Sequence, residues 1–204
     1  MAEITAPPEV AAHAEHAPPA GPLDFEIVPL KGLPIVGLIA VLLIAAIASN
    51  KLWPLTFFHV AGGAAWTIID LFLGLVLGPI MGKMSVPARI EFTTKLMPKM
   101  VLIMPTVVTA TLAAGWQLST YLGTNLTSNP LHGWVVASMI VVGVMAILAL
   151  GLLEPANIAV LFELRKPQPN PAVIEKLMRR FIFTAGITGA MQIGTLIIMT
   201  RLAS

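Results

Sequence analysis

Five long apolar stretches follow one another along the chain, separated by shorter polar segments. They cover approximately residues 33–50, 57–81, 100–122, 134–162 and 181–200. Each is close to, or longer than, the roughly 20 residues that a helix needs to cross a bilayer. None alternates apolar and polar residues as the strands of a transmembrane barrel do. The pattern therefore predicts an all-α integral membrane bundle of five transmembrane helices.

The distribution of basic residues predicts the orientation of these helices. The segments after the second and fourth stretches are basic, whereas the segment 123–133 contains no Lys or Arg. Because basic loops stay on the cytoplasmic side, we expect the N-terminus inside and the C-terminus outside, with only Lys51 and Arg201 as outer basic residues. The basic residues expected inside are Lys31, Lys83, Arg89, Lys95, Lys99, Arg165, Lys166, Lys176, Arg179 and Arg180.

Composition agrees with a membrane protein and excludes several classes of chemistry. Hydrophobic residues make up 57% of the 204 residues and charged residues 11%, and the mean hydropathy is +0.88. The chain has no cysteine, which excludes disulfides, thiolate metal ligands and thiol catalysis. The net charge of +2 comes from short segments beside apolar stretches, a topology signal that argues against nucleic-acid binding.

The chain divides into a tail and one membrane domain. Residues 1–32 are acidic, rich in Ala and Pro, and lack the basic start of a secretory signal, so we expect a disordered cytoplasmic tail. Residues 33–204 form the five-helix transmembrane domain. The expected partners are the lipid bilayer and either subunits of a larger membrane complex or further copies of the chain. We expect the protein in a bacterial inner (plasma) membrane.

Asp70, near the middle of the second stretch, is the first candidate for a functional residue. An ionised carboxylate inside a bilayer costs several kcal/mol unless it is paired or hydrated. At 100° per residue, six small or polar residues lie within roughly 100° of arc, and they are His59, Gly63, Thr67, Asp70, Gly74 and Gly78. The opposite side carries Ile68, Ile69, Phe72 and Val76 and is expected to face lipid. The stripe is either a packing seam or a polar site.

Two other stretches offer hydrogen-bonding residues for the Asp70 side of the bundle. Thr106, Thr109, Gln117 and Thr120 share one side of the third stretch with Ala110 and Ala113. The fifth stretch carries Thr184, Thr188 and Thr195 on one side, with Gln192 beside them at mid-depth. Packing these sides together would surround Asp70 with donors.

Glu154 is the second candidate, because it precedes Pro155 inside the fourth stretch. Proline cannot donate a backbone hydrogen bond, so the carbonyl of Gly151 loses its helical partner and a local kink is expected. Glu154 either forms an ion pair with Arg179 or Arg180, or is the cytoplasmic end of a polar path that passes Asp70 and opens near His59.

His59 and His132 are the candidate cofactor ligands. Both are predicted at the outer face, and two histidines suit haem iron or copper, although an interfacial histidine is often only solvated. Met97, Met100 and Met104 follow helical spacing at the inner end of the third stretch. Thioether sulfur suits Cu(I), and flexible packing is the alternative role.

The start of the second stretch resembles a known membrane superfamily. The segment Phe58-His59-Val60-Ala61-Gly62-Gly63-Ala64-Ala65-Trp66 places a tryptophan seven residues after a histidine, and Gly133-Trp134 opens the fourth stretch. This order resembles the superfamily of copper-resistance protein D and the haem-containing membrane protoporphyrinogen oxidase. The resemblance implies haem b or copper, with His59 as a haem ligand. Where the oxidase type carries a histidine and a lysine after the second tryptophan, this chain has Val135, Val136, Ala137 and Ser138.

Two functional hypotheses therefore remain from the sequence. The first is a non-catalytic membrane protein or a subunit of a larger complex, indicated by the glycine seam and the missing ligands. The second is haem, copper or proton handling, in which His59 and His132 bind the cofactor or Asp70, Glu154 and Gln192 form a polar path.

Overall fold

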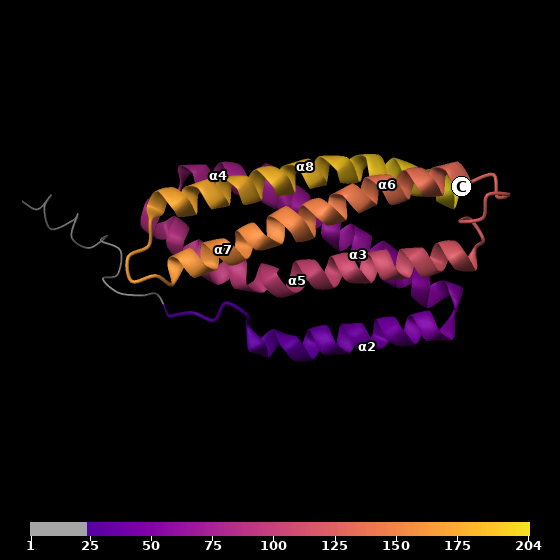
Figure 1. Cartoon of the computed structure of the whole chain (residues 1–204), viewed down its shortest axis with the longest axis horizontal. Helices are drawn as coiled ribbons and strands as arrows, with labels where there is room; N and C mark the ends of the chain where they lie inside the picture. The colour runs from indigo at the N-terminus through magenta and orange to yellow at the C-terminus, as the bar shows by residue number, and fades with distance from the viewer. Residues whose placement is uncertain (1–23) are drawn as a thin grey trace, which may run out of the picture.

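The computed structural model of the chain describes residues 24–204, which form a bundle of long helices (Figure 1). The predicted tail falls largely on residues 1–23, outside the described residues. Within residues 24–32, Phe25 and Ile27 pack against the main core. In chain order the helical elements are η1 (Leu30–Gly32), α2 (Leu33–Ser49), α3 (Leu52–Leu71), η2 (Phe72–Leu77), α4 (Gly78–Lys83), α5 (Val86–Tyr121), α6 (His132–Leu148), η3 (Ala149–Leu153), α7 (Glu154–Leu164) and α8 (Pro171–Ala203).

The predicted all-α bundle with five membrane-spanning helices is confirmed. Five helical stretches among the described residues are long and apolar enough to cross a membrane, and they are Leu30–Ser49, Leu52–Lys83, Val86–Tyr121, His132–Leu164 and Pro171–Ala203. The last four have 32 to 36 residues, so each is about 50 Å long at about 1.5 Å per residue. They extend beyond a hydrocarbon core about 30 Å thick, and the chain is compatible with a multi-pass membrane protein.

The basic residues that were expected in the loops after the second and fourth stretches lie mostly within helices. Only Met84 and Ser85 separate α4 from α5, and only residues 165–170 separate α7 from α8. Helices α5 and α8 begin at Val86 and Pro171, well before the apolar stretches 100–122 and 181–200. Their first turns contain few apolar residues, so the hydrophobic pattern did not show that they belong to these helices. The basic residues now placed within helices are Lys83, Arg89, Lys95, Lys99, Lys176, Arg179 and Arg180.

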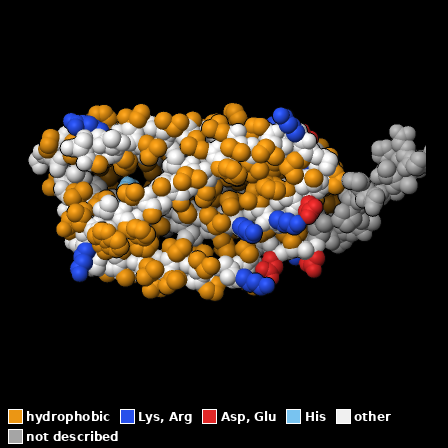
Figure 2. All heavy atoms as spheres, turned by 180° about the vertical axis from the view of Figure 1, so that it is seen from behind, with side chains coloured by type: hydrophobic (Ala, Val, Ile, Leu, Met, Phe, Trp, Pro, Cys, Tyr) orange, Lys and Arg blue, Asp and Glu red, His pale blue; other side chains and the backbone are white. Residues whose placement is uncertain are grey.

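These basic residues still gather at one end of the bundle, where α4 and α7 end and α5 and α8 begin. We call it the basic end. Figure 2 shows charged side chains at the ends of the molecule and apolar side chains over the face between them. Ile68, Phe72 and Val76, on the side predicted to face lipid, have exposed fractions of 66%, 52% and 45%, whereas Ile69 is half-buried. An apolar belt between polar ends is the surface that a bilayer requires.

Two turns of π-helix, η2 and η3, interrupt the second and fourth spans. Each ends two residues before a proline, Pro79 or Pro155. Proline lacks the N–H group of the helical ladder, and its ring clashes with the carbonyl four residues earlier. A wider turn moves that carbonyl away, so the distortion predicted at Glu154-Pro155 takes the form of a π turn. Such turns occur often at functional sites.

Helix α8 packs against the α3–η2 junction through glycine. A Cβ atom on Gly74 would lie 2.6 Å from Gly186 Cα, and one on Gly189 would lie 3.2 Å from the backbone nitrogen of Leu71. The predicted seam therefore exists at Gly74 and also at Gly78, where a Cβ would lie 2.7 Å from Ile182. Gly82, four residues further along the chain, takes no part in this contact, because a Cβ there would have no atom within 4 Å.

The main core lies between the second, third, fourth and fifth spans, and methionine fills much of it. Met97, Met100 and Met104 are buried there, in agreement with a packing role.

Helix α2 lies at one edge of the bundle, where it packs mainly against α5 (Figure 1).

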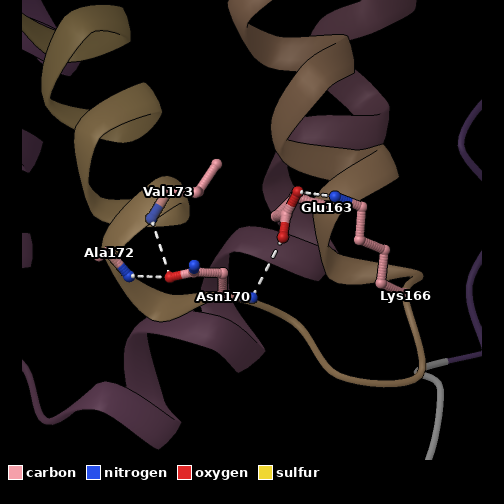
Figure 3. A network of polar contacts seen from close by, with 5 residues as sticks. All are labelled: Glu163, Lys166, Asn170, Ala172 and Val173. Atoms are coloured by element: carbon pink, nitrogen blue, oxygen red, sulfur yellow. Dashed lines mark hydrogen bonds and ion pairs between the residues drawn. The ribbon is translucent and has the colours of Figure 1, made fainter.

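The connection between α7 and α8 is held by a polar network (Figure 3). Asn170 caps α8, because its side-chain oxygen accepts from the backbone N–H groups of Ala172 at 3.0 Å and Val173 at 3.4 Å. The Asn170 N–H donates to Glu163 Oε1 at 3.1 Å, and Lys166 Nζ donates to Glu163 Oε2 at 2.5 Å. The network thus fixes where α8 starts relative to the end of α7.

We expect Asn170→Ala to lower the free energy of unfolding by about 1 kcal/mol, the typical loss for an N-cap. Asn170→Asp keeps the accepting oxygen and should stay near the wild-type value. The measurement is unfolding of the detergent-solubilised protein with added SDS. Equal losses in both variants would show that the cap does not stabilise α8.

Candidate functional site

Asp70 and Gln192 form a buried hydrogen-bonded pair between α3 and α8. Gln192 Nε2 donates to Asp70 Oδ2 at 3.0 Å, and the exposed fractions of the two residues are 0% and 3%. Gly189 allows α8 to approach α3 closely at this point, because a Cβ there would lie only 3.3 Å from the backbone carbonyl carbon of Asp70. The structure thus brings together two of the three residues predicted for a polar path.

The donors expected around Asp70 come from α8 and not from α5. Thr188 also lies beside the Asp70 carboxylate, although its hydroxyl donates to the backbone carbonyls of its own helix. On α5, Thr106 donates to the carbonyl of Leu102, and Gln117 donates to Asn50 Oδ1. The prediction that the polar side of the third stretch surrounds Asp70 was therefore wrong, because those groups have other partners.

Glu154 shares a small cavity with Asp70. The volume of this cavity is about 10 Å³, which is about the space that one water molecule needs. Its apolar lining consists of Leu73, Met104, Ala149, Leu150, Leu153 and Phe181. Leu73 belongs to η2, and Ala149, Leu150 and Leu153 belong to η3. Both π turns therefore help to form the cavity, and we call Asp70, Glu154 and Gln192 the carboxylate site.

Several polar atoms at this site have no hydrogen-bond partner. Within residues 24–204, six buried side-chain nitrogen or oxygen atoms lack one. Four of these are Asp70 Oδ1, Glu154 Oε1, Trp66 Nε1 and Asn157 Oδ1. Buried polar groups are nearly always paired, so each exception needs an explanation. Here the exceptions concentrate on the two carboxylates and their nearest polar neighbours.

Trp66 and Asn157 are site residues that the sequence reasoning did not select. Trp66 lies beside the Asp70 carboxylate and Asn157 beside that of Glu154. Asn157 is fully buried, and its Nδ2 donates to the carbonyl of Met97 at 3.3 Å. The spacings 66/70 and 154/157 place each pair on one helix face, and this signal could have identified both residues.

The carboxylate site lies deep in the bundle, measured from the basic end. Asp70 precedes Lys83 by 13 residues and Glu154 precedes Leu164 by 10 residues. At about 1.5 Å per residue these distances are about 20 Å and about 15 Å. Glu154 is therefore the closer of the two to the basic end.

The predicted ion pair of Glu154 with Arg179 or Arg180 is not present. The ion pairs of the described residues are Lys95–Glu91 at 2.6 Å and Lys166–Glu163 at 2.5 Å. Both lie near the basic end, where α5 begins and α7 ends. The carboxylate site thus contains two acidic groups and no basic side chain paired with either of them.

The structure places the two predicted cofactor ligands outside the carboxylate site. His59 lies two turns inside α3 and not at its start, because α3 begins at Leu52. Its Nδ1 is 3.0 Å from the carbonyl oxygen of Thr111. His132 is the first residue of α6, and its Nδ1 is buried without a partner. Neither histidine lines the cavity at Asp70.

One edge of the His59 ring is tightly packed between α3 and α5. A Cβ atom on Gly115 would lie 2.5 Å from His59 Nδ1, and one on Gly62 would lie 2.4 Å from the Thr111 hydroxyl. Helices α3 and α5 are therefore in close contact along the Nδ1 edge of the ring, and the Nδ1 atom is not free to bind a metal. In the described part of the chain, no group of three or more His, Asp or Glu residues is arranged to hold a metal ion.

Comparison of the chain with protein-family models, with curated proteins and with solved structures finds no match in any of the three. Its function is therefore argued from the carboxylate site alone.

Proposed function

We propose that this membrane protein carries protons at the carboxylate site. The observation that supports the proposal is that Asp70 and Glu154 share a cavity for about one water molecule, each with a buried oxygen that has no partner. A water molecule there would need two to four polar partners, and the two carboxyl oxygens supply two of them. Such an arrangement can pass a proton from one carboxyl group to the other.

Electrostatics also favours protons as the ligand. Two ionised carboxylates in a medium of low dielectric constant repel each other and lose their hydration, which costs several kcal/mol without a cation. A metal cation such as Mg²⁺ or Ca²⁺ takes six or more oxygen ligands, whereas the other residues that line the cavity are apolar. A proton needs only one oxygen, so it is the cation that can best neutralise these carboxylates.

The path for these protons is proposed to begin at the basic end. Glu154 is half-buried and is the carboxylate nearer that end, whereas Asp70 is fully buried. We assign Glu154 the exchange of protons with that side and Asp70 the deeper position, with Gln192 orienting the Asp70 carboxylate. The predicted opening near His59 lies eleven residues from Asp70, or about 16 Å along α3, and a proton would have to cross this distance to reach the other end of the bundle.

The alternative is a non-catalytic subunit of a larger membrane complex. Its support is the close packing of α8 on the α3–η2 junction at Gly74 and Gly189, which alone would explain a polar and small-residue stripe. It does not account for two carboxylates on one cavity, because Ser or Asn would supply hydrogen bonds at lower cost. For this reason we favour the proton-carrying function.

Proton flux into proteoliposomes tests the proposed function. Vesicles loaded with a pH-sensitive dye receive a potassium gradient and valinomycin, so that the membrane potential drives protons inward. We expect the protein to acidify the vesicles faster than empty liposomes, and Asp70→Asn and Glu154→Gln to reduce the flux to the background rate. These amides preserve shape and hydrogen bonding but cannot bind the proton.

Glu91→Gln is the matched control, because Glu91 is exposed and paired with Lys95 outside the carboxylate site. It should leave the flux unchanged. A wild-type flux in Asp70→Asn would contradict the proton-carrying function and favour the non-catalytic interpretation.

A further inference from the structure

A second, larger hollow lies on the outside of the bundle between η2–α4 and α8. Its volume is about 590 Å³. Glycine and apolar side chains line most of its length, including Gly74, Gly78, Ile182 and Gly186. The charged residues in its lining are Arg89, Glu175 and Arg179. Arg89 lies in the first turn of α5, and Glu175 and Arg179 lie within the first three turns of α8, at the basic end. We call this hollow the arginine groove.

The arginines of the groove have no carboxylate partner among the described residues. Arg89 donates one bond, from Nη2 to the carbonyl of Met84 at 3.2 Å, while its Nε is buried without a partner. Arg179 is exposed. Together with Glu175, the lining carries a formal charge of +1. This end of the groove is therefore complementary to a ligand with a single negative charge.

The dimensions of the groove match one leaflet of a bilayer. From Arg179 to Ala190, the deepest α8 residue in the lining, there are eleven residues, or about 16 Å along the helix. Half of a hydrocarbon core about 30 Å thick is about 15 Å. Because α8 is about 50 Å long, its first turns reach past the hydrocarbon, and Arg179 lies where headgroups are expected.

We propose that the arginine groove binds one phospholipid with a singly charged anionic headgroup. The phosphate lies between Arg89 and Arg179, and one acyl chain follows the glycine-lined floor toward Ala190. Basic pockets between membrane helices bind anionic headgroups in this way. The inference concerns a different surface from the carboxylate site and does not depend on proton transport.

A lipid fits the groove better than a helix of a second protein does. Two of the glycines that might receive a helix of a second protein are already in contact with α8, since Gly74 lies against Gly186 and Gly78 against Ile182. A lipid acyl chain is narrower than a helix and can enter the groove between these contacts.

Native mass spectrometry of the delipidated full chain tests this proposal. The protein is titrated with phosphatidylglycerol or with phosphatidylcholine that has the same acyl chains. We expect the wild type to prefer phosphatidylglycerol, and Arg179→Gln to weaken that lipid's binding about fivefold, the effect of about 1 kcal/mol per basic residue. Glu175→Gln removes the opposing charge and should strengthen it.

Arg180→Gln is the matched control, because Arg180 is exposed and adjacent but does not line the groove. It should bind both lipids as the wild type does. Ala190→Trp fills the deep end and should reduce binding of either lipid.

Three results would overturn the proposal. The first is equal binding of the two lipids by the wild type, and the second is unchanged phosphatidylglycerol binding in Arg179→Gln or Ala190→Trp. The third is a wild-type dimer that Ala190→Trp separates, which would assign the groove to a second copy of the chain.

Discussion

Gln192→Leu is expected to lower the free energy of unfolding by about 2 kcal/mol. The substitution removes the donor that bonds Asp70 Oδ2 at 3.0 Å, and Asp70 is fully buried with its other oxygen already unpartnered. A hydrogen bond to a charged group contributes about 1.5–3 kcal/mol, and leaving its partner unsatisfied costs the full desolvation. Unfolding in SDS, followed by circular dichroism, measures the loss.

The double variant Asp70→Leu/Gln192→Leu separates the structural role of the pair from its chemical role. Replacing both partners of a buried hydrogen bond by apolar groups can be nearly neutral, so we expect most of the stability to return. The proton flux should not return, because the carboxyl group is gone. A double variant less stable than Gln192→Leu alone would show that Asp70 is held mainly by other contacts.

Gly74→Ala is expected to cost about 2 kcal/mol and to separate α8 from the α3–η2 junction. The new Cβ would lie 2.6 Å from Gly186 Cα and 2.9 Å from its nitrogen, and backbone atoms cannot move away as a side chain can. Overpacking of this kind costs up to about 3 kcal/mol, and the better helix propensity of alanine returns about 1 kcal/mol. The same unfolding assay reports the difference.

Gly37→Ala is the control for this substitution, because Gly37 lies within α2 and a Cβ there would have no atom within 4 Å. It should be neutral or slightly stabilising. If Gly74→Ala is as stable as Gly37→Ala, the close contact between η2 and α8 does not hold the bundle together.

The number and type of the helices could be predicted because each span must carry about 20 apolar residues whatever it packs against. The helix bounds could not be predicted, since α5 and α8 begin with charged turns that do not follow the apolar pattern. The π turns were also missed as such. Pro155 indicated a distortion, but proline alone does not distinguish a kink from a wider turn.

The carboxylate site was predictable residue by residue but not as an arrangement. Asp70, Glu154 and Gln192 were selected because polar groups are costly in a membrane, and the structure gathers them. Helix periodicity places residues on faces but does not say which helices meet, so Thr106 and Gln117 were expected near Asp70 and have other partners. For the same reason the sequence placed His59 and Asp70 on one helix side but did not predict that His59 contacts α5.

Infrared difference spectroscopy tests the central claim, that Asp70 and Glu154 bind and release protons at one buried site. The wild type in lipid is cycled between acidic and alkaline buffer, and the C=O stretching band of protonated carboxyl groups is recorded. We expect a band whose frequency shifts in D₂O. Asp70→Asn should remove one part of the band and Glu154→Gln another part, and each substitution should shift the frequency of the part that remains. Spectra of both variants identical to the wild type would contradict the account.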